Sequence, residues 1–148
     1  MFSKNLLAVF ALVGSAFAVC PDALRFGSLA ISPEPIVLGQ PVTFTANNTC
    51  AIELGYTPVY SDYTLVVPAA NNSGYQPPIY FARRDGPFDN IDTFSITFDP
   101  TYYGFTTYPD SQYEVVWTTT HVGNNDSYGT TLTTGSITYA VSIAQASD

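Results

Sequence analysis

Between residues 24 and 143 the sequence alternates apolar and polar side chains with a period of two, in short runs separated by Gly, Pro, Asn and Asp. A period of two is typical of a β-strand with one face in a core, because successive side chains point to opposite faces. Helical periodicity is absent, and the separating residues are those that supply turns. The alternation predicts strands at residues 24–31, 36–38, 42–46, 62–67, 79–82, 91–98, 113–121 and 131–143.

Seven or eight short strands with such turns between them predict an all-β fold, an antiparallel β-sandwich in a single domain. Its inward side chains would include Phe44, Tyr63, Phe94 and Trp117. Threonines and serines fill the alternate positions, which suits solvated sheet faces. No internal repeat or flexible linker is visible in the sequence.

Residues 1–18 have the three parts of a secretory signal peptide. Lys4 ends a short basic region, residues 6–13 are apolar, and residues 16–18 are mostly small. A membrane anchor is the alternative, but the apolar run is far shorter than the ~20 residues that a bilayer requires. We therefore expect a mature domain at 19–148 that is secreted and extracellular.

The mature chain is strongly acidic. Lys4 leaves with the signal peptide, so Arg25, Arg83 and Arg84 stand against twelve acidic residues, which gives a net charge of −9. This balance repels phosphate backbones and anionic lipid, so we expect neither nucleic acid nor membrane as a partner. Arg83 and Arg84 are expected to pair with neighbouring acids at the surface, with a dibasic processing site as the alternative.

Two cysteines, Cys20 and Cys50, remain in the mature chain. An even pair in an exported protein predicts a disulfide. The bridge would close a loop of about 30 residues and stabilise the fold by roughly 3.5 kcal/mol on the chain-entropy model. Acylation of Cys20 after cleavage is the alternative, but Val19 occupies the position where a small residue is needed.

Three Asn-x-Ser/Thr sequons lie in turn-like stretches of the sequence. They begin at Asn47, Asn71 and Asn125. In a eukaryotic host they predict a glycoprotein, with sugars on polar, exported segments.

The segment Tyr-Pro-Asp-Ser-Gln-Tyr-Glu-Val at residues 108–115 resembles the tyrosine corner of fibronectin type III and related immunoglobulin-like domains. The resemblance implies an immunoglobulin-like β-sandwich in which Tyr113 begins strand F and its hydroxyl bonds back to nearby backbone. Residues 31–44 likewise look like the first and second strands of such a domain. Tyr108 stands where leucine is usual, and the immunoglobulin Cys…Trp…Cys spacing is missing.

The chain also resembles the necrosis-inducing secreted effector family of fungi, more in spacing than in identity. The shared layout has a Gly-Gln-Pro-Val-Thr-Phe-Thr-Ala opening, an alternating strand at 94–98, a strand at Tyr113 and a C-terminal Tyr-x-Val strand. This resemblance implies a non-enzymatic protein that binds host immune components.

His121 is the only histidine, which excludes a multi-histidine metal site and requires any Ser-His-Asp triad to use this residue. No Gly-x-Ser-x-Gly elbow is present to supply the serine. By parity His121 lies on the inward face at a strand end, where we expect a structural role. The acids lie mostly in turns, with no cleft-forming insertion to pair two of them for glycoside hydrolysis. We expect a non-catalytic protein with no cofactor and no metal.

The alternative to a metal-free protein is a calcium site in one acidic loop. Asp85, Asp89, Asn90 and Asp92 are crowded together, and oxygen-rich loops at the end of a sandwich can bind calcium. The spacing does not match an EF-hand. We favour ordinary turn chemistry, in which Asp and Asn cap their own backbone.

Tyr102, Tyr103 and Phe105 fall together in a loop-like stretch and are the candidate binding residues. Loop aromatics can stack on sugars or anchor a protein interface, because they bury a large area at low entropic cost. In the alternative interpretation, the same rings cover the open end of the sandwich.

These features predict a secreted, monomeric, non-catalytic protein that binds a partner protein through loops at one end of its sandwich, as an effector would. The alternative is a module that binds carbohydrate or cell-wall polysaccharide through loop tyrosines. An unrecognised hydrolase and a protease inhibitor with a protruding loop are further alternatives.

Overall fold

The computed structural model of the 148-residue chain describes residues 19–109, 111–123 and 131–145. The strands are β1 (Ser28–Ser32), β2 (Ile36–Val37), β3 (Pro41–Asn47), β4 (Pro58–Val66), β5 (Ile79–Asp85), β6 (Ile91–Thr97), β7 (Tyr113–Gly123), β8 (Thr131–Val141) and β9 (Ile143–Ala144). The short helices are η1 (Asp22–Leu24), α1 (Thr49–Glu53) and α2 (Tyr103–Thr107).

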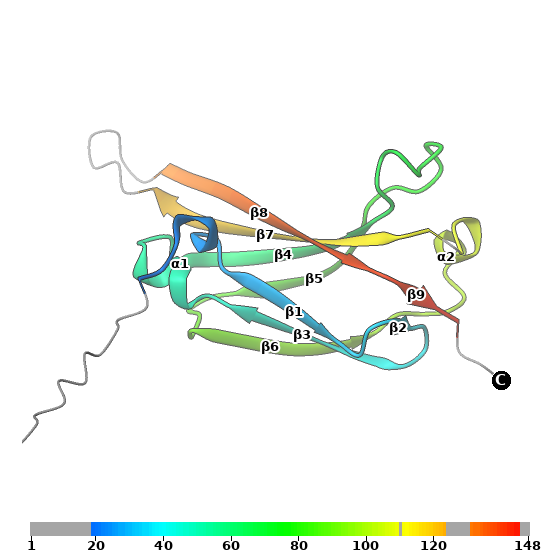
Figure 1. Cartoon of the computed structure of the whole chain (residues 1–148), viewed down its shortest axis with the longest axis horizontal. Helices are drawn as coiled ribbons and strands as arrows, with labels where there is room; N and C mark the ends of the chain where they lie inside the picture. Colours follow the sequence, from blue (N-terminus) through cyan, green and yellow to red (C-terminus); the bar gives the residue numbers. More distant parts are fainter. Residues whose placement is uncertain (1–18, 110, 124–130, 146–148) are drawn as a thin grey trace, which may run out of the picture.

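Two antiparallel sheets pack face to face and form the body of the protein (Figure 1). One sheet has the strand order β1-β3-β6, and the other has the order β5-β4-β7-β8. A separate parallel pairing joins β2 to β9. The sequence prediction of an all-β sandwich is confirmed, and the parallel β2–β9 pair is an addition to it.

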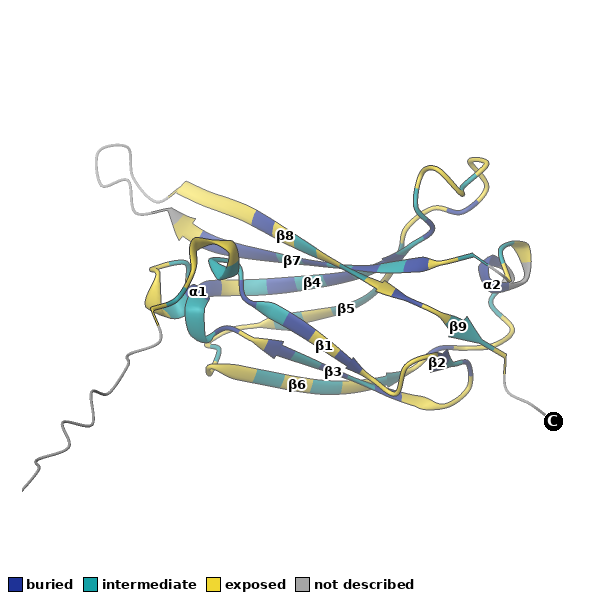
Figure 2. Ribbon diagram, in the orientation of Figure 1, coloured by how far each residue is buried: buried dark blue, intermediate teal, exposed yellow. Residues whose placement is uncertain are grey.

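Aromatic rings from both sheets build the core. Phe44 of β3 lies with its ring centroid 6.3 Å from that of Tyr63 on β4, and Trp117 of β7 stacks on Tyr63 at 6.1 Å. All three side chains are at most 1 % exposed. Figure 2 shows burial alternating along the strands that carry them, so the inward positions predicted from the alternation are confirmed.

Gly27, just before β1, lets the Trp117 ring approach the backbone. Its φ is +88°, a region that residues with a Cβ rarely adopt. A methyl group at this position would lie 2.8 Å from the Trp117 ring and 2.6 Å from the carbonyl oxygen of Asn47. Glycine therefore satisfies both the turn and the packing of the core.

Several element boundaries differ from the sequence prediction. The run 24–31 is not one strand, because η1 occupies its start and β1 begins at Ser28. The run 131–143 is divided at Ser142, where the chain leaves β7 and β9 turns to pair with β2. Helices α1 and α2 have no counterpart in the prediction, because five residues are too few for a helical repeat to appear.

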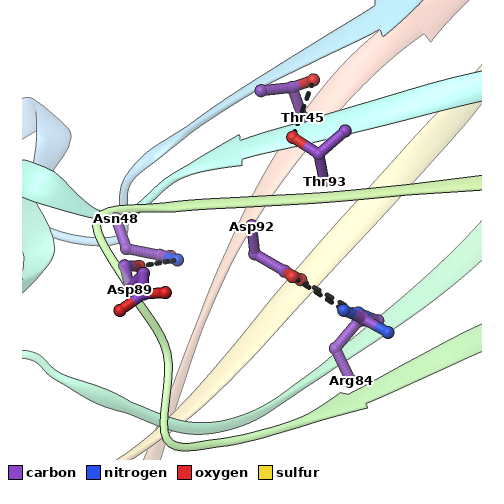
Figure 3. Close-up of polar contacts among 6 residues, drawn as sticks. All are labelled: Thr45, Asn48, Arg84, Asp89, Asp92 and Thr93. Carbon is purple, nitrogen blue, oxygen red and sulfur yellow. Dashed lines mark hydrogen bonds and ion pairs between the residues drawn. The ribbon is translucent and has the colours of Figure 1, made fainter.

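An ion pair joins the two sheets across one open side of the sandwich, between edge strands β5 and β6 (Figure 3). Arg84 donates through Nε and Nη2 to the two carboxylate oxygens of Asp92, at 3.0 and 2.8 Å. This bidentate hydrogen bond raises the pKa of Arg84. Arg83 pairs with Asp85 at 3.0 Å, so the predicted pairing of both arginines with neighbouring acids is confirmed.

The predicted disulfide is confirmed. Cys20 and Cys50 are bonded, with their Cα atoms 5.3 Å apart and a separation of 30 positions in the sequence. The bridge ties the segment before β1 to α1, at the end of the sandwich opposite α2 (Figure 1).

Candidate functional site

The loop between β4 and β5, residues 67–78, projects from the end of the sandwich that also carries α2 (Figure 1). Asn72 holds this loop together from within. Its Oδ1 accepts the backbone N–H of Gly74 at 2.9 Å and that of Gln76 at 3.3 Å. Its Nδ2 donates to the carbonyl oxygen of Gln76 at 2.6 Å. A single amide side chain therefore fixes the backbone on both sides of Tyr75.

Contacts with the segment around α2 hold the same loop from outside. The Tyr108 hydroxyl donates to Asn72 Oδ1 at 3.0 Å and accepts the N–H of Ser73 at 3.0 Å. Gln76 is 4 % exposed, and its carboxamide lies directly against Gly104, where a Cβ would collide with it. The loop is thus anchored at two points to a neighbouring element.

Tyr75 lies between these anchors and is 73 % exposed, the most exposed aromatic side chain among the described residues. Gly74 precedes it with φ +91°, a conformation that favours glycine. The result is a large, two-torsion side chain presented to solvent on a braced backbone. We define Asn72, Gly74, Tyr75, Gln76 and Tyr108 as the Tyr75 loop site.

The three candidate binding residues of the sequence do not form the expected exposed patch. Phe105 is 2 % exposed and packs in the core with its ring centroid 6.0 Å from that of Phe98. Its apolar ring faces inward from α2, which corrects its assignment as an exposed contact residue. Tyr102 is half-buried against Phe105, and the side chain of Tyr103 lies outside the described residues. At Phe105 and Tyr102, aromatic rings cover the end of the core.

Tyr113 has the hydroxyl-to-backbone bond that the sequence predicts for a tyrosine corner. The ring is 1 % exposed, and its hydroxyl donates to the carbonyl oxygen of Tyr108 at 3.1 Å. Burial raises the pKa of Tyr113. This bond fixes the chain between α2 and β7, and through Tyr108 it supports the Tyr75 loop site.

The signal that could have pointed to Tyr75 is present in the sequence as Asn72-Ser73-Gly74-Tyr75-Gln76. An Asn two residues before a Gly predicts a side-chain-braced turn, and the following tyrosine is then held in place. The stretch alone does not reveal that Tyr108, 33 positions further along, completes the brace.

Two of the predicted glycosylation sites have exposed asparagines, Asn47 at the end of β3 and Asn71 in the β4–β5 loop. Asn125 lies outside the described residues. Exposure is a requirement for a sugar on the folded chain, and glycosylation of all three sites stays a prediction.

The acidic residues around β5 and β6 separate into individual contacts. Asp85 pairs with Arg83 and Asp92 with Arg84, while the carbonyl oxygen of Asp89 accepts a bond from Asn48 at 3.3 Å (Figure 3). In the described part of the chain, no three His, Cys, Asp or Glu side chains gather as a metal site would require. Nor does any helix in the described ranges have the length and apolar character to span a bilayer.

His121 lies inside an aromatic cluster at the disulfide end of the sandwich. It is 4 % exposed, and its ring centroid lies 5.0 Å from that of Tyr56 and 5.6 Å from that of Phe26. Its Nδ1 is buried without a hydrogen-bond partner. The inward orientation predicted by parity is confirmed.

Burial lowers the pKa of His121, which predicts a specific pH dependence of stability. The folded pKa is below the unfolded value of 6.5, so the unfolded chain binds the extra proton first. The contribution of His121 should be complete above pH 6.5 and lost as pH falls toward the folded pKa. Urea unfolding at several pH values should therefore show that the free energy of unfolding falls more steeply with decreasing pH in wild type than in His121→Phe. Identical slopes in the two proteins would contradict this assignment.

Comparison with protein-family models, curated proteins and solved structures finds no match to this chain.

Proposed function

We propose that this protein is a secreted, non-catalytic binding domain that engages a partner protein through the Tyr75 loop site, as an effector acting outside the cell that makes it. The observation that carries the proposal is the 73 % exposure of Tyr75 on a loop braced at Asn72 and at Gln76. An exposed tyrosine on a fixed backbone offers a partner a large amphipathic surface at low entropic cost, which favours a binding role.

The bracing supports binding because it removes part of the entropic cost of association. A flexible loop must be ordered when it binds, whereas a preorganised one has already lost that freedom on folding. Tyrosine adds a large amphipathic area with few rotatable bonds, which is why it is common at the centres of protein interfaces.

The strand order supports the resemblance to immunoglobulin-like domains. With Tyr113 at the start of strand F, β1, β3 and β6 correspond to A, B and E, and β4, β7 and β8 correspond to C, F and G. Strand β5 then takes the place of C′ beside C. On this correspondence the Tyr75 loop site lies between C and C′, next to the E–F connection that carries α2 and at the end opposite the B–C connection that carries α1. Loops positioned by a rigid scaffold commonly carry binding residues.

The environment of His121 supports a non-catalytic role. The chain has one histidine, and it is buried among Phe26 and Tyr56 at the end of the sandwich opposite Tyr75. A general base must reach a substrate proton, and a 4 % exposed imidazole enclosed by aromatic rings is poorly placed to do so.

A second candidate function, binding of cell-wall polysaccharide, is favoured by Tyr80 on the outer face of β5. Tyr80 is 57 % exposed and donates to Asp62 at 2.8 Å, which raises the pKa of Tyr80. Arg83 lies beside them, with its guanidinium carbon 3.9 Å from the ring centroid of Tyr60. An exposed ring beside charged hydrogen-bonding groups is a combination that suits sugar recognition.

The two candidates are separated by matched tyrosine variants, Tyr75→Ala and Tyr80→Ala. Immobilised wild type is exposed to the extracellular fluid in which the protein acts, captured proteins are identified, and Kd is measured with the purified partner. Tyr75→Ala is expected to weaken that Kd by about 30-fold, the cost of losing an interface hot spot of about 2 kcal/mol. Tyr80→Ala should bind as wild type does.

A parallel assay measures retention on insoluble chitin, β-glucan and cellulose. Retention that Tyr80→Ala abolishes and Tyr75→Ala leaves intact would favour the polysaccharide function and overturn the protein-binding proposal. An unchanged Kd for Tyr75→Ala would overturn it as well.

A further inference from the structure

A depression of about 370 Å³ lies at the disulfide end of the sandwich, far from the Tyr75 loop site. Its apolar lining includes Pro21, Leu24 and the disulfide-bonded Cys20 and Cys50. Its volume is at the lower end of the ~300–1,000 Å³ typical of small-molecule sites, which suits one sugar ring better than a branched oligosaccharide.

Asn47 and Thr49 also line this depression, and they are the first and third residues of a glycosylation sequon. Asn47 is exposed, whereas the intervening Asn48 is 1 % exposed and engaged with Asp89. Asn47 Oδ1 accepts the N–H of Thr49 at 3.0 Å. This bond occupies the amide oxygen and leaves Nδ2 as the atom available to carry a sugar.

We propose that the depression is the seat of the first N-acetylglucosamine of a glycan on Asn47, which packs against Leu24 and the Cys20–Cys50 bridge. Asn47 belongs to the lining of the depression, so a sugar on its Nδ2 is held there by the covalent bond. The free sugar needs no affinity for the depression. An apolar patch beside a sequon is thereby covered by the amphipathic face of a sugar.

The linkage follows the ordinary chemistry of the secretory pathway. The co-reactant is an oligosaccharide carried on a lipid diphosphate. The Nδ2 of Asn47 forms a bond to sugar C1, the bond from C1 to the diphosphate oxygen breaks, and the amide proton leaves while the lipid diphosphate departs with the electron pair. Neither oxidant nor reductant is required.

A seated sugar would shield the disulfide, because both cysteines line the depression and are only partly buried. The sequon at Asn71 provides a matched comparison. Asn71 is exposed in the β4–β5 loop, at the other end of the sandwich, and does not line this depression.

The test compares two single-site glycoproteins secreted from a eukaryotic host. One is Asn71→Gln/Asn125→Gln, which keeps only the Asn47 sequon, and the other is Asn47→Gln/Asn125→Gln, which keeps only the Asn71 sequon. Each is trimmed to one N-acetylglucosamine with an endoglycosidase and compared with the same variant made without sugar in a bacterial periplasm. Intact mass and peptide mapping establish occupancy.

We expect the sugar on Asn47 to raise Tm by at least about 2 °C. It should also slow reduction of the disulfide by dithiothreitol at least threefold, on the order expected for partial loss of access. The sugar on Asn71 should change neither quantity. When Leu24→Ser is added to the Asn47 glycoprotein, the forms with and without sugar should have the same Tm, although Asn47 is still glycosylated.

Three results would overturn the proposal. They are the absence of sugar from Asn47 in the secreted protein, a sugar on Asn47 that alters neither Tm nor reduction, and equal effects of the sugars on Asn47 and Asn71.

Discussion

Replacing Trp117 with alanine is expected to lower the free energy of unfolding by about 3–5 kcal/mol. Trp117 is 1 % exposed, stacks on Tyr63 with 8° between the ring planes, and fills the space that Gly27 leaves open. Removing the ring leaves a cavity bounded by both sheets, which the surrounding strands cannot close without losing their pairing.

Urea unfolding followed by far-UV circular dichroism measures this effect, since Trp117 is the only tryptophan and the fluorescence probe disappears with it. Trp117→Phe should cost less, because it keeps a ring on Tyr63 and removes an indole N–H that is buried without an acceptor. Leu132→Ala, on the exposed end of β8, should lie within about 0.5 kcal/mol of wild type. A loss below about 1 kcal/mol for Trp117→Ala would show that the stack is not central to the core.

Removing the disulfide should have an effect of similar size. The double variant Cys20→Ser/Cys50→Ser opens a bridge across 30 positions, and the chain-entropy model gives a loss of about 3.5 kcal/mol. Residues 19–27 belong to no strand, and the bridge is the covalent link between them and α1. We therefore also expect residues 19–27 to become sensitive to proteases in the variant.

Wild type with its disulfide reduced is the control, since it has the same loss of constraint without a change of side-chain polarity. The two species should unfold at the same urea concentration. If the double serine variant keeps the free energy of unfolding of wild type, the disulfide does not stabilise the fold and this prediction is wrong.

The sequence predicted the parts of the fold whose physics is local. Alternation placed Phe44, Tyr63 and Trp117 in the core, because a strand has only two faces and the apolar one must be buried. The cysteine pair predicted the bridge from compartment and number alone. In each case the relevant information lies within one strand or in a count of residues.

The candidate site was less accessible to prediction because its contacts join distant segments. The sequence makes Phe105 a candidate binding residue and leaves open whether its ring is exposed or covers the end of the sandwich. Helix α2 turns the ring toward Phe98 and Tyr113, which no local pattern reveals. The presentation of Tyr75 depends on Tyr108 and Gly104, which belong to a different turn. Loops take their shape from what they pack against, so their residue types alone do not determine which rings are exposed.

The Arg84–Asp92 pair has a consequence for how copies of this chain behave toward one another. Strands β5 and β6 each end a sheet and would present unpaired backbone groups to a second molecule. Charges that point inward at such edges oppose the docking of another strand, since docking would strip water from the ion pair. The ion pair that joins the two sheets therefore also opposes the addition of a strand from a second copy of this chain.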